Sequence, residues 1–176
     1  MVKHSLNTII NCLGEGDYLA LIPFANRAKI GLQLTEMTEK NKKIAEKTVK
    51  DMKANGSTNI WDGIRISMDV SKKEICEGLN TYIILLTDGE PNMNPPQGII
   101  PTFRKYIGQE GLHSNVHVFG YGYQLDTVLL TQIASEGIGT YAYIPDCSMV
   151  GTIFVNFLSN SLATVTNQAT LTLEPA

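Results

Sequence analysis

One stretch of the chain limits its fold more than any other. Residues 81–87 read TYIILLT, a continuous run of β-branched and aliphatic side chains. An unbroken apolar run of this length is typical of a strand that is buried on both faces, as in a parallel sheet covered by helices. The run stops abruptly at Asp88. The sequence therefore predicts a buried strand that delivers a carboxylate at its carboxyl end.

Helix-like and strand-like segments alternate along the rest of the chain. Apolar periodicity predicts helices over 2–13, 36–54, 60–76, 126–137 and 148–164, a helix or irregular loop over 97–110, and further strands at 18–25, 28–34, 115–122 and 139–144. Strands that alternate with helices of this length indicate parallel crossover connections. The predicted fold class is α/β: a Rossmann-like, doubly wound, mostly parallel sheet with helices on both faces and one antiparallel edge strand, 28–34.

Composition excludes several classes of function. The 176 residues suit one domain, and a formal charge of −3 gives no basic surface for nucleic acid. The apolar stretches are shorter than the ~20 residues that span a bilayer, and no signal peptide opens the chain, so we expect a cytoplasmic location. The widely spaced Cys12, Cys76 and Cys147 form no zinc pattern. We expect them to be buried free thiols.

Two loops carry candidate functional residues. In open α/β sheets, ligands bind beyond the carboxyl ends of the strands, where Asp88 is expected. Asp88, followed by Gly89, suits a hard cation or a polar ligand, but an aspartate that caps a turn is common and is the favoured interpretation of Asp88 taken alone. The loop at 54–59 joins two helices, and Thr58 or Asn59 would cap the helix that begins at Ile60. We expect this loop at the same edge of the sheet as Asp88.

The two loops also carry a family resemblance. The segments GSTNIWDGI (56–64) and ILLTDGEPN (84–92) resemble two of the three signature segments of the von Willebrand factor type A family, in the right order. The likeness extends from residue 1 to about 165. It implies a six-strand doubly wound domain over 1–165. Residues 166–176 would then be the start of a following β-rich segment or a linker.

The resemblance implies a metal-ion-dependent adhesion site. Thr58 and Asp88 match two of its ligands for Mg²⁺ or Mn²⁺, and an acidic side chain of a protein partner would complete the coordination. The rim around it would consist of Ser57, Asn59, Glu90 and Asn92. The third signature, Asp-x-Ser-x-Ser, does not occur in this chain. We therefore expect an incomplete site that binds Mg²⁺ or Mn²⁺ weakly or not at all, and an Asp88 that accepts hydrogen bonds from the 56–59 loop or the Thr58 hydroxyl.

The missing signature also affects the sheet. In the family it follows a first, central strand, which this sequence lacks, so we expect an N-terminally truncated domain. We predict that strands 18–25 and 81–87 pair directly, which gives the order 28–34, 18–25, 81–87, 115–121, 139–144. The alternative is a strand supplied by a second chain, in a strand-exchanged oligomer.

Three functions follow from these observations. The first is a non-enzymatic protein-interaction module of the von Willebrand type with a degenerate metal site. The second is a complete Mg²⁺-dependent adhesion module in a longer parent protein. The third is a metal-dependent hydrolase or phosphotransfer domain, because both also place an aspartate at a strand end. The chain lacks dinucleotide and P-loop glycine motifs, which disfavours nucleotide enzymes.

Overall fold

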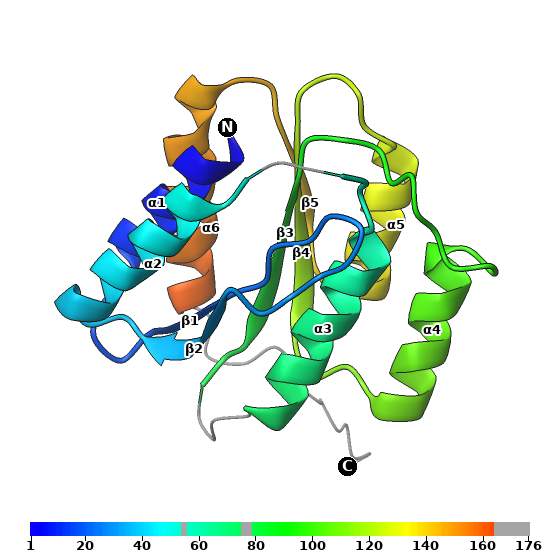
Figure 1. Ribbon diagram of the computed structural model, residues 1–176, viewed down its shortest axis with the longest axis horizontal. Coiled ribbons are helices and arrows are strands. Elements are labelled where there is room, and N and C mark those ends of the chain that lie inside the picture. The colour runs from blue at the N-terminus through cyan, green and yellow to red at the C-terminus, as the bar shows by residue number, and fades with distance from the viewer. Residues whose placement is uncertain (54–55, 75–78, 164–176) are drawn as a thin grey trace, which may run out of the picture.

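The computed structural model describes residues 1–53, 56–74 and 79–163 (Figure 1). Its helices are α1 (Val2–Cys12), α2 (Glu39–Asp51), α3 (Ile60–Lys73), α4 (Ile99–Glu110), α5 (Thr127–Glu136), α6 (Val150–Ala163) and a short 3₁₀ helix, η1 (Cys147–Met149). Its strands are β1 (Tyr18–Leu21), β2 (Leu32–Glu36), β3 (Tyr82–Thr87), β4 (Asn115–Tyr121) and β5 (Tyr141–Ile144). The predicted helices and strands are present with shifted ends. Residues 166–176 lie outside the described residues, so the domain boundary stays a prediction.

The three-strand half consists of β3, β4 and β5 with helices α3 to α6. The strands are parallel in the order β3-β4-β5, with Tyr82 opposite Asn115 at the start of the first pair. Alternate residues of β4 face opposite layers: Val118 packs with α3, α4 and α5, whereas Phe119 packs with α1 and α6. Figure 1 shows these helices on either side of the sheet. The parallel sheet with helices on both faces is therefore confirmed.

The two-strand half consists of β1, β2 and α2. The strands are antiparallel, and their register shifts between Leu19 and Leu21. Leu21 packs with residues of α1, α2 and the turn after β2, in a cluster of Ile10, Leu21, Met37, Ala45 and Val49. The predicted antiparallel partner of the first strand is thus present, although β2 begins at Leu32.

The predicted five-strand sheet is wrong. Within the described residues, β1 pairs with β2 and β3 pairs with β4, but β1 and β3 belong to separate sheets. The reason lies in α1, which packs against both α2 and α6. Its neighbouring residues Ile9 and Ile10 enter different apolar clusters, one in each half. Direct pairing of β1 with β3 would pull the halves together and remove α1 from one cluster.

Two further expectations concern single features. Cys12 is a free thiol, but it is exposed at the end of α1, so the prediction of a buried side chain is wrong there. Cys76 and the side chain of Cys147 lie outside the described residues. Among the helices of the described ranges, none is long and apolar enough to cross a membrane.

Candidate functional site

The loops that follow β3, β4 and β5 emerge at one edge of the sheet, at the top of Figure 1. Asp88 comes directly after β3 and is exposed. The Thr87 hydroxyl donates to the carbonyl oxygen of Gly89 at 3.1 Å, which turns the chain back over the strand end. A Cβ atom added to Gly89 would lie 4.0 Å from Oγ1 of Thr58. The fold therefore brings the segment of Asp88 beside that of Thr58.

Reciprocal hydrogen bonds tie these two segments together. The backbone N–H of Thr58 donates to Oδ1 of Asn92 at 2.8 Å, and the backbone N–H of Asn92 donates to the carbonyl oxygen of Thr58 at 3.2 Å. Two loops that are distant in sequence thus form one rim. Asn92, expected on the ligand rim, uses its side-chain oxygen to hold that rim in place.

Asn26 holds the loop from the other side. Its Oδ1 accepts the backbone N–H of Ser57 at 2.6 Å, and its carbonyl oxygen accepts the Asn59 side-chain amide at 3.2 Å. Gly56 has a positive φ of 83°, and a Cβ there would lie only 2.5 Å from Oδ1 of Asn26. Glycine is therefore required at this position. Sequence reasoning missed Asn26, although its place directly after the apolar run 18–25 matches that of Asp88 after 81–87.

The expected partners of Asp88 are engaged elsewhere. The N–H groups of Ser57, Thr58 and Asn59 donate to Asn26, Asn92 and the carbonyl oxygen of Ala25, in that order. The prediction that these amides bind the Asp88 carboxylate is wrong, because two asparagine side chains and one backbone carbonyl group accept their hydrogen bonds instead. Asn59 instead caps α3 by accepting the N–H of Asp62 at 3.1 Å, one of the two predicted caps.

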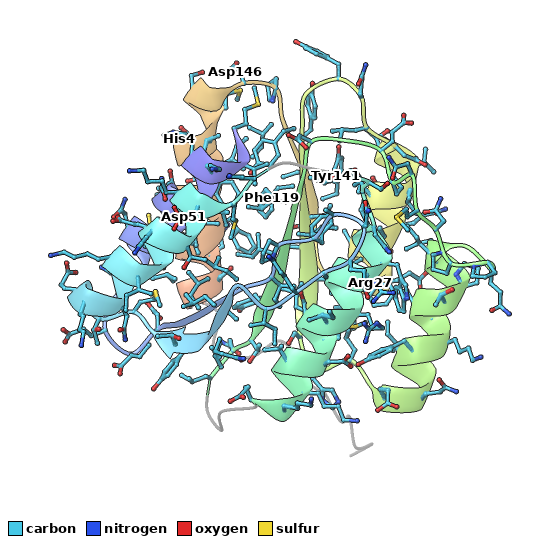
Figure 2. All side chains as sticks on the ribbon, viewed as in Figure 1. His4, Arg27, Asp51, Phe119, Tyr141 and Asp146 are labelled. Atoms are coloured by element: carbon cyan, nitrogen blue, oxygen red, sulfur yellow. The ribbon has the colours of Figure 1, made fainter. Side chains whose placement is uncertain are left out.

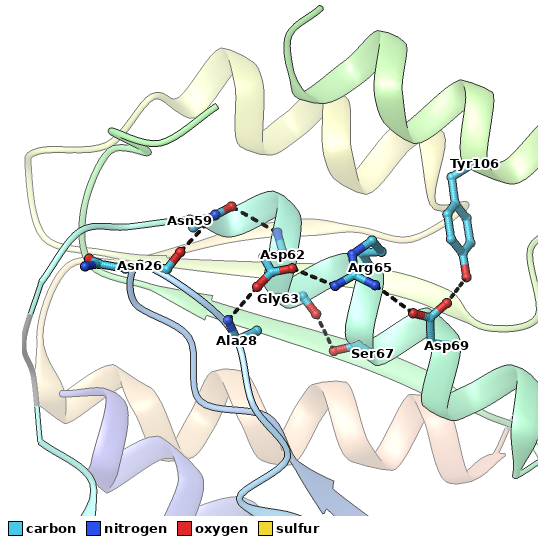
Figure 3. Close-up of polar contacts among 9 residues, drawn as sticks. All are labelled: Asn26, Ala28, Asn59, Asp62, Gly63, Arg65, Ser67, Asp69 and Tyr106. Carbon is cyan, nitrogen blue, oxygen red and sulfur yellow. Dashed lines mark hydrogen bonds and ion pairs between the residues drawn. The ribbon is translucent and has the colours of Figure 1, made fainter. Parts of the chain in front are cut away.

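A chain of charged and polar contacts continues from this cap along α3 (Figure 3). Asp62 accepts the backbone N–H of Ala28 at 2.7 Å and pairs with Arg65 at 2.8 Å. Arg65 also pairs with Asp69 at 3.0 Å, which accepts the hydroxyl of Tyr106 on α4. Burial alone would raise the pKa of Asp62, but the Ala28 amide and the Arg65 guanidinium outweigh it and hold that pKa below its ordinary value.

These contacts join the two halves of the molecule. Asn26 and Ala28 belong to the loop between β1 and β2, whereas Asn59 and Asp62 begin α3. We call these four residues the loop clamp. Next to it, a Cβ added to Gly63 would lie 3.0 Å from the ring of Phe24, so the loop packs closely on α3 as well as bonding to it.

A buried tyrosine lies beneath the rim. Burial raises the pKa of Tyr121, at the end of β4, to about 12, and the carboxylate of Asp88 adds to the increase, while the Ser5 hydroxyl opposes it. Asp88 therefore opposes ionisation of the Tyr121 hydroxyl, but burial is the larger cause.

The residues present do not by themselves fit a magnesium site. Thr58 offers one hydroxyl and Asp88 one carboxylate, and Glu90 is exposed on the same turn. In the part of the chain that the structure describes, no three His, Cys, Asp or Glu side chains gather as a metal-binding group. Mg²⁺ requires octahedral oxygen coordination and is usually held by more than one protein or substrate anion. Thr58 and Asp88 could supply only part of such a shell.

The chain is similar in sequence and in structure to several known proteins. The chain is 24% identical to the uncharacterized protein YfbK of Escherichia coli over 177 residues, which covers 99% of this chain and 30% of the relative. A von Willebrand factor type A structure from Catenulispora acidiphila superposes with a TM-score of 0.79 at 21% identity, over 92% of this chain and 37% of that one. The chain spans about a third or less of the length of the curated relatives it matches.

A metal has been placed in one protein of similar fold. Proximal thread matrix protein 1 from the mussel byssus, described with a zinc-occupied MIDAS motif, has a TM-score of 0.66 at 20% identity, over 89% of this chain and 39% of that one. The model of the von Willebrand factor type A domain matches residues 1–154. This match covers most of the sequence and agrees with the fold and with both loop segments, so the chain belongs to the von Willebrand factor type A domain family.

Proposed function

We propose that this chain is a non-enzymatic protein-interaction module that contacts its partner through the carboxyl edge of the sheet. Domains of this family are in general protein-interaction modules. The observation that carries the proposal is the reciprocal bonding of Thr58 and Asn92, which fixes two loops as one rim. A rim that is ordered before binding loses little conformational entropy when a partner docks.

We infer that the metal site is incomplete in this chain and that its contacts at this edge do not depend on Mg²⁺. The support is the donor set: Thr58 and Asp88 provide one hydroxyl and one carboxylate, whereas a hard cation such as Mg²⁺ requires about six oxygen ligands. Without a cation, Asp88 and Glu90 repel an acidic partner.

One observation favours the second candidate, a complete Mg²⁺-dependent adhesion module in a longer parent protein. Within the described residues, the Thr58 hydroxyl and the Asp88 carboxylate are not engaged in hydrogen bonds with the loops around them, so both remain available as ligands. A further acidic segment placed beside them would complete a shell, and an acidic partner would then bind through the cation.

Calorimetric titration with Mg²⁺ and with Mn²⁺ tests whether the metal site of this chain is incomplete. We expect no micromolar binding to the chain described here. Micromolar affinity that is lost in Asp88→Ala would contradict the incomplete site. Asp51→Ala, which removes an equally exposed carboxylate at the end of α2, is the matched control and should change nothing.

The contact surface itself is tested by selecting peptides from a random displayed library on the immobilised protein. The selected peptides are then titrated into ¹⁵N-labelled protein. We expect shifts of amides in 56–59, 88–92 or the other loops of the carboxyl edge, and weaker binding in Glu90→Ala but not in Asp51→Ala. Peptides that bind only elsewhere on the molecule would refute the proposed surface.

A further inference from the structure

A hollow lined by tyrosines lies at the same edge, and neither Thr58 nor Asp88 is among the residues that line it. It has a volume of about 370 Å³, and its walls come from the end of β4, the start of α5 and β5: Gly122, Tyr123, Leu125, Thr127, Tyr141 and Tyr143. This volume is at the lower limit for small-molecule sites and suits a single long side chain of a protein partner.

The backbone around the hollow leaves aromatic rings exposed to solvent. Gly122 has a φ of 79°, a conformation that favours glycine, and the turn it makes leaves Tyr123 with 91% of its surface exposed. Tyr143 is 39% exposed on β5. Exposed aromatic side chains that flank a concave surface are typical of interaction sites, since tyrosine is enriched among residues that dominate binding.

The floor of the hollow contains an unsatisfied polar group. The hydroxyl of Tyr141 is buried and has no hydrogen-bond partner among the described residues. A Cβ added to Gly120 would lie 3.1 Å from that hydroxyl and 2.7 Å from Leu125, so glycine makes room for the ring. Burial raises the pKa of Tyr141, which therefore remains a neutral hydroxyl.

The segments that follow the three parallel strands carry charge of one sign. The segments that follow β3, β4 and β5, residues 88–98, 122–126 and 145–149, contain Asp88, Glu90, Asp126 and Asp146 but no lysine, arginine or histidine. Asp126 lies between Leu125 and Thr127, which both line the hollow, whereas Figure 2 shows Asp146 above α6 and apart from Tyr141. Tyrosine rings with acidic loops around them are complementary to a cation that carries an apolar stem.

We propose that this hollow, which we call the tyrosine hollow, binds an arginine side chain of a protein partner. The proposal rests on the proposed function, because it assigns the partner's chemistry at the same edge. The planar guanidinium stacks on the exposed faces of Tyr123 and Tyr143, its stem packs on Leu125, and the acidic loops stabilise its charge. Lysine lacks the planar group, and an acidic side chain meets repulsion from the acidic segments of this edge.

The test uses ¹⁵N-labelled protein and blocked peptides of the form Gly-Gly-X-Gly-Gly, in which X is arginine, citrulline or glutamate. We expect the arginine peptide to shift the amides of Gly122, Leu125 and Thr127 saturably. Citrulline has the same shape without the charge and should bind at least about threefold more weakly. The glutamate peptide should not bind at the hollow.

Variants locate the site. Tyr123→Ala changes a nearly fully exposed side chain, so it should leave the fold intact and weaken the arginine peptide about two- to fivefold. Tyr143→Ala should have a similar effect. Tyr18→Ala on β1 is the matched control, since it removes a tyrosine that is 44% exposed in the other half, and it should leave binding unchanged.

Each other outcome overturns the inference. Equal binding of the citrulline peptide would show an apolar site, and the absence of saturable shifts would show that there is no site for arginine. Shifts centred on 57–59 and 88–92 would refute the hollow but leave the carboxyl edge as the contact surface. If the arginine peptide and the library-selected peptides both bind away from this edge, the inference and the proposed function fail together.

Discussion

The two halves of the molecule differ in how far their strands are paired and buried. In the three-strand half, β4 has hydrogen-bonded neighbours on both edges and helices on both faces, and six of its seven residues are buried. In the two-strand half, β1 has one described neighbour, and one of its four residues is buried. The first half carries the apolar core, whereas the second is held in place by α1 and the loop clamp. The two-strand half is therefore attached to the three-strand half by loops and a helix, and not by pairing between the described strands.

The largest expected effect is the loss of a core ring from the three-strand half. Phe119 is buried on β4 with its ring centre 4.5 Å from that of Phe154. Phe119→Ala should lower the free energy of unfolding by about 3–5 kcal/mol, since it leaves a cavity among aromatic rings. Leu19→Ala on β1 removes a half-buried side chain and should cost about 1–2 kcal/mol. Urea denaturation measures both values, and equal losses would contradict the difference between the halves.

Amide hydrogen exchange compares the halves without mutation. We expect the amides of β4 to exchange at least about 100-fold more slowly than those of β1, which corresponds to roughly 2.7 kcal/mol of opening free energy. Strands flanked on both edges open only with the whole fold, whereas a short two-strand unit opens locally. Uniformly slow exchange throughout 18–25 and 81–87 would instead support the continuous sheet or a strand supplied by another chain.

The loop clamp should contribute a pH-dependent part of the stability. The pKa of Asp62 is held below its ordinary value, so its contribution is complete above the unfolded-state pKa of about 3.9 and is lost as the pH falls through the folded-state pKa. Asp62→Asn should lower the free energy of unfolding by about 1–2 kcal/mol at pH 7 and reduce its dependence on pH between about pH 5 and pH 3.

The control for this change lies inside the three-strand half. Glu136 pairs with Arg104 between α4 and α5, and its pKa is also lowered by that contact. Glu136→Gln should cost less at pH 7 because Arg104 is exposed and the pair is screened by water. A larger loss of stability in Glu136→Gln than in Asp62→Asn would contradict the expected contribution of the loop clamp to stability.

The smallest expected effects on stability distinguish Asn92 from Asp88, which both lie in the segment after β3. Asn92→Ala removes the acceptor of the Thr58 N–H and should lower stability by about 0.5–1.5 kcal/mol. Asp88→Ala removes an exposed carboxylate without a hydrogen bond to the 56–59 loop, and its effect should stay within about 0.5 kcal/mol. Thermal unfolding of both variants measures the difference. A greater loss from Asp88→Ala would restore a structural role for that carboxylate.

Local patterns predicted most of the secondary structure, and longer-range choices were not predictable. The TYIILLT run identified β3 because burial on both faces leaves a continuous apolar sequence. The pairing of β1 depends on where α1 packs, and no property of residues 18–25 alone determines that. Asn26 was not predicted, and Asn92 was predicted on the rim but not as the acceptor of the Thr58 N–H. An asparagine amide can bond to any nearby backbone group, and the sequence does not show which group is nearest.

The placement of α1 has a consequence for the order of folding. The two-strand half is contiguous from β1 to α2, and the three-strand half is contiguous from α3 to α6, so each can form from contacts between segments close in sequence. Helix α1 instead packs on both halves, because Ile10 shares a cluster with Leu21 and Val49, whereas Ile9 shares one with the distant Phe154. We expect α1 to be synthesised before both halves and to dock after them, so that the rate of its docking limits the appearance of the native state.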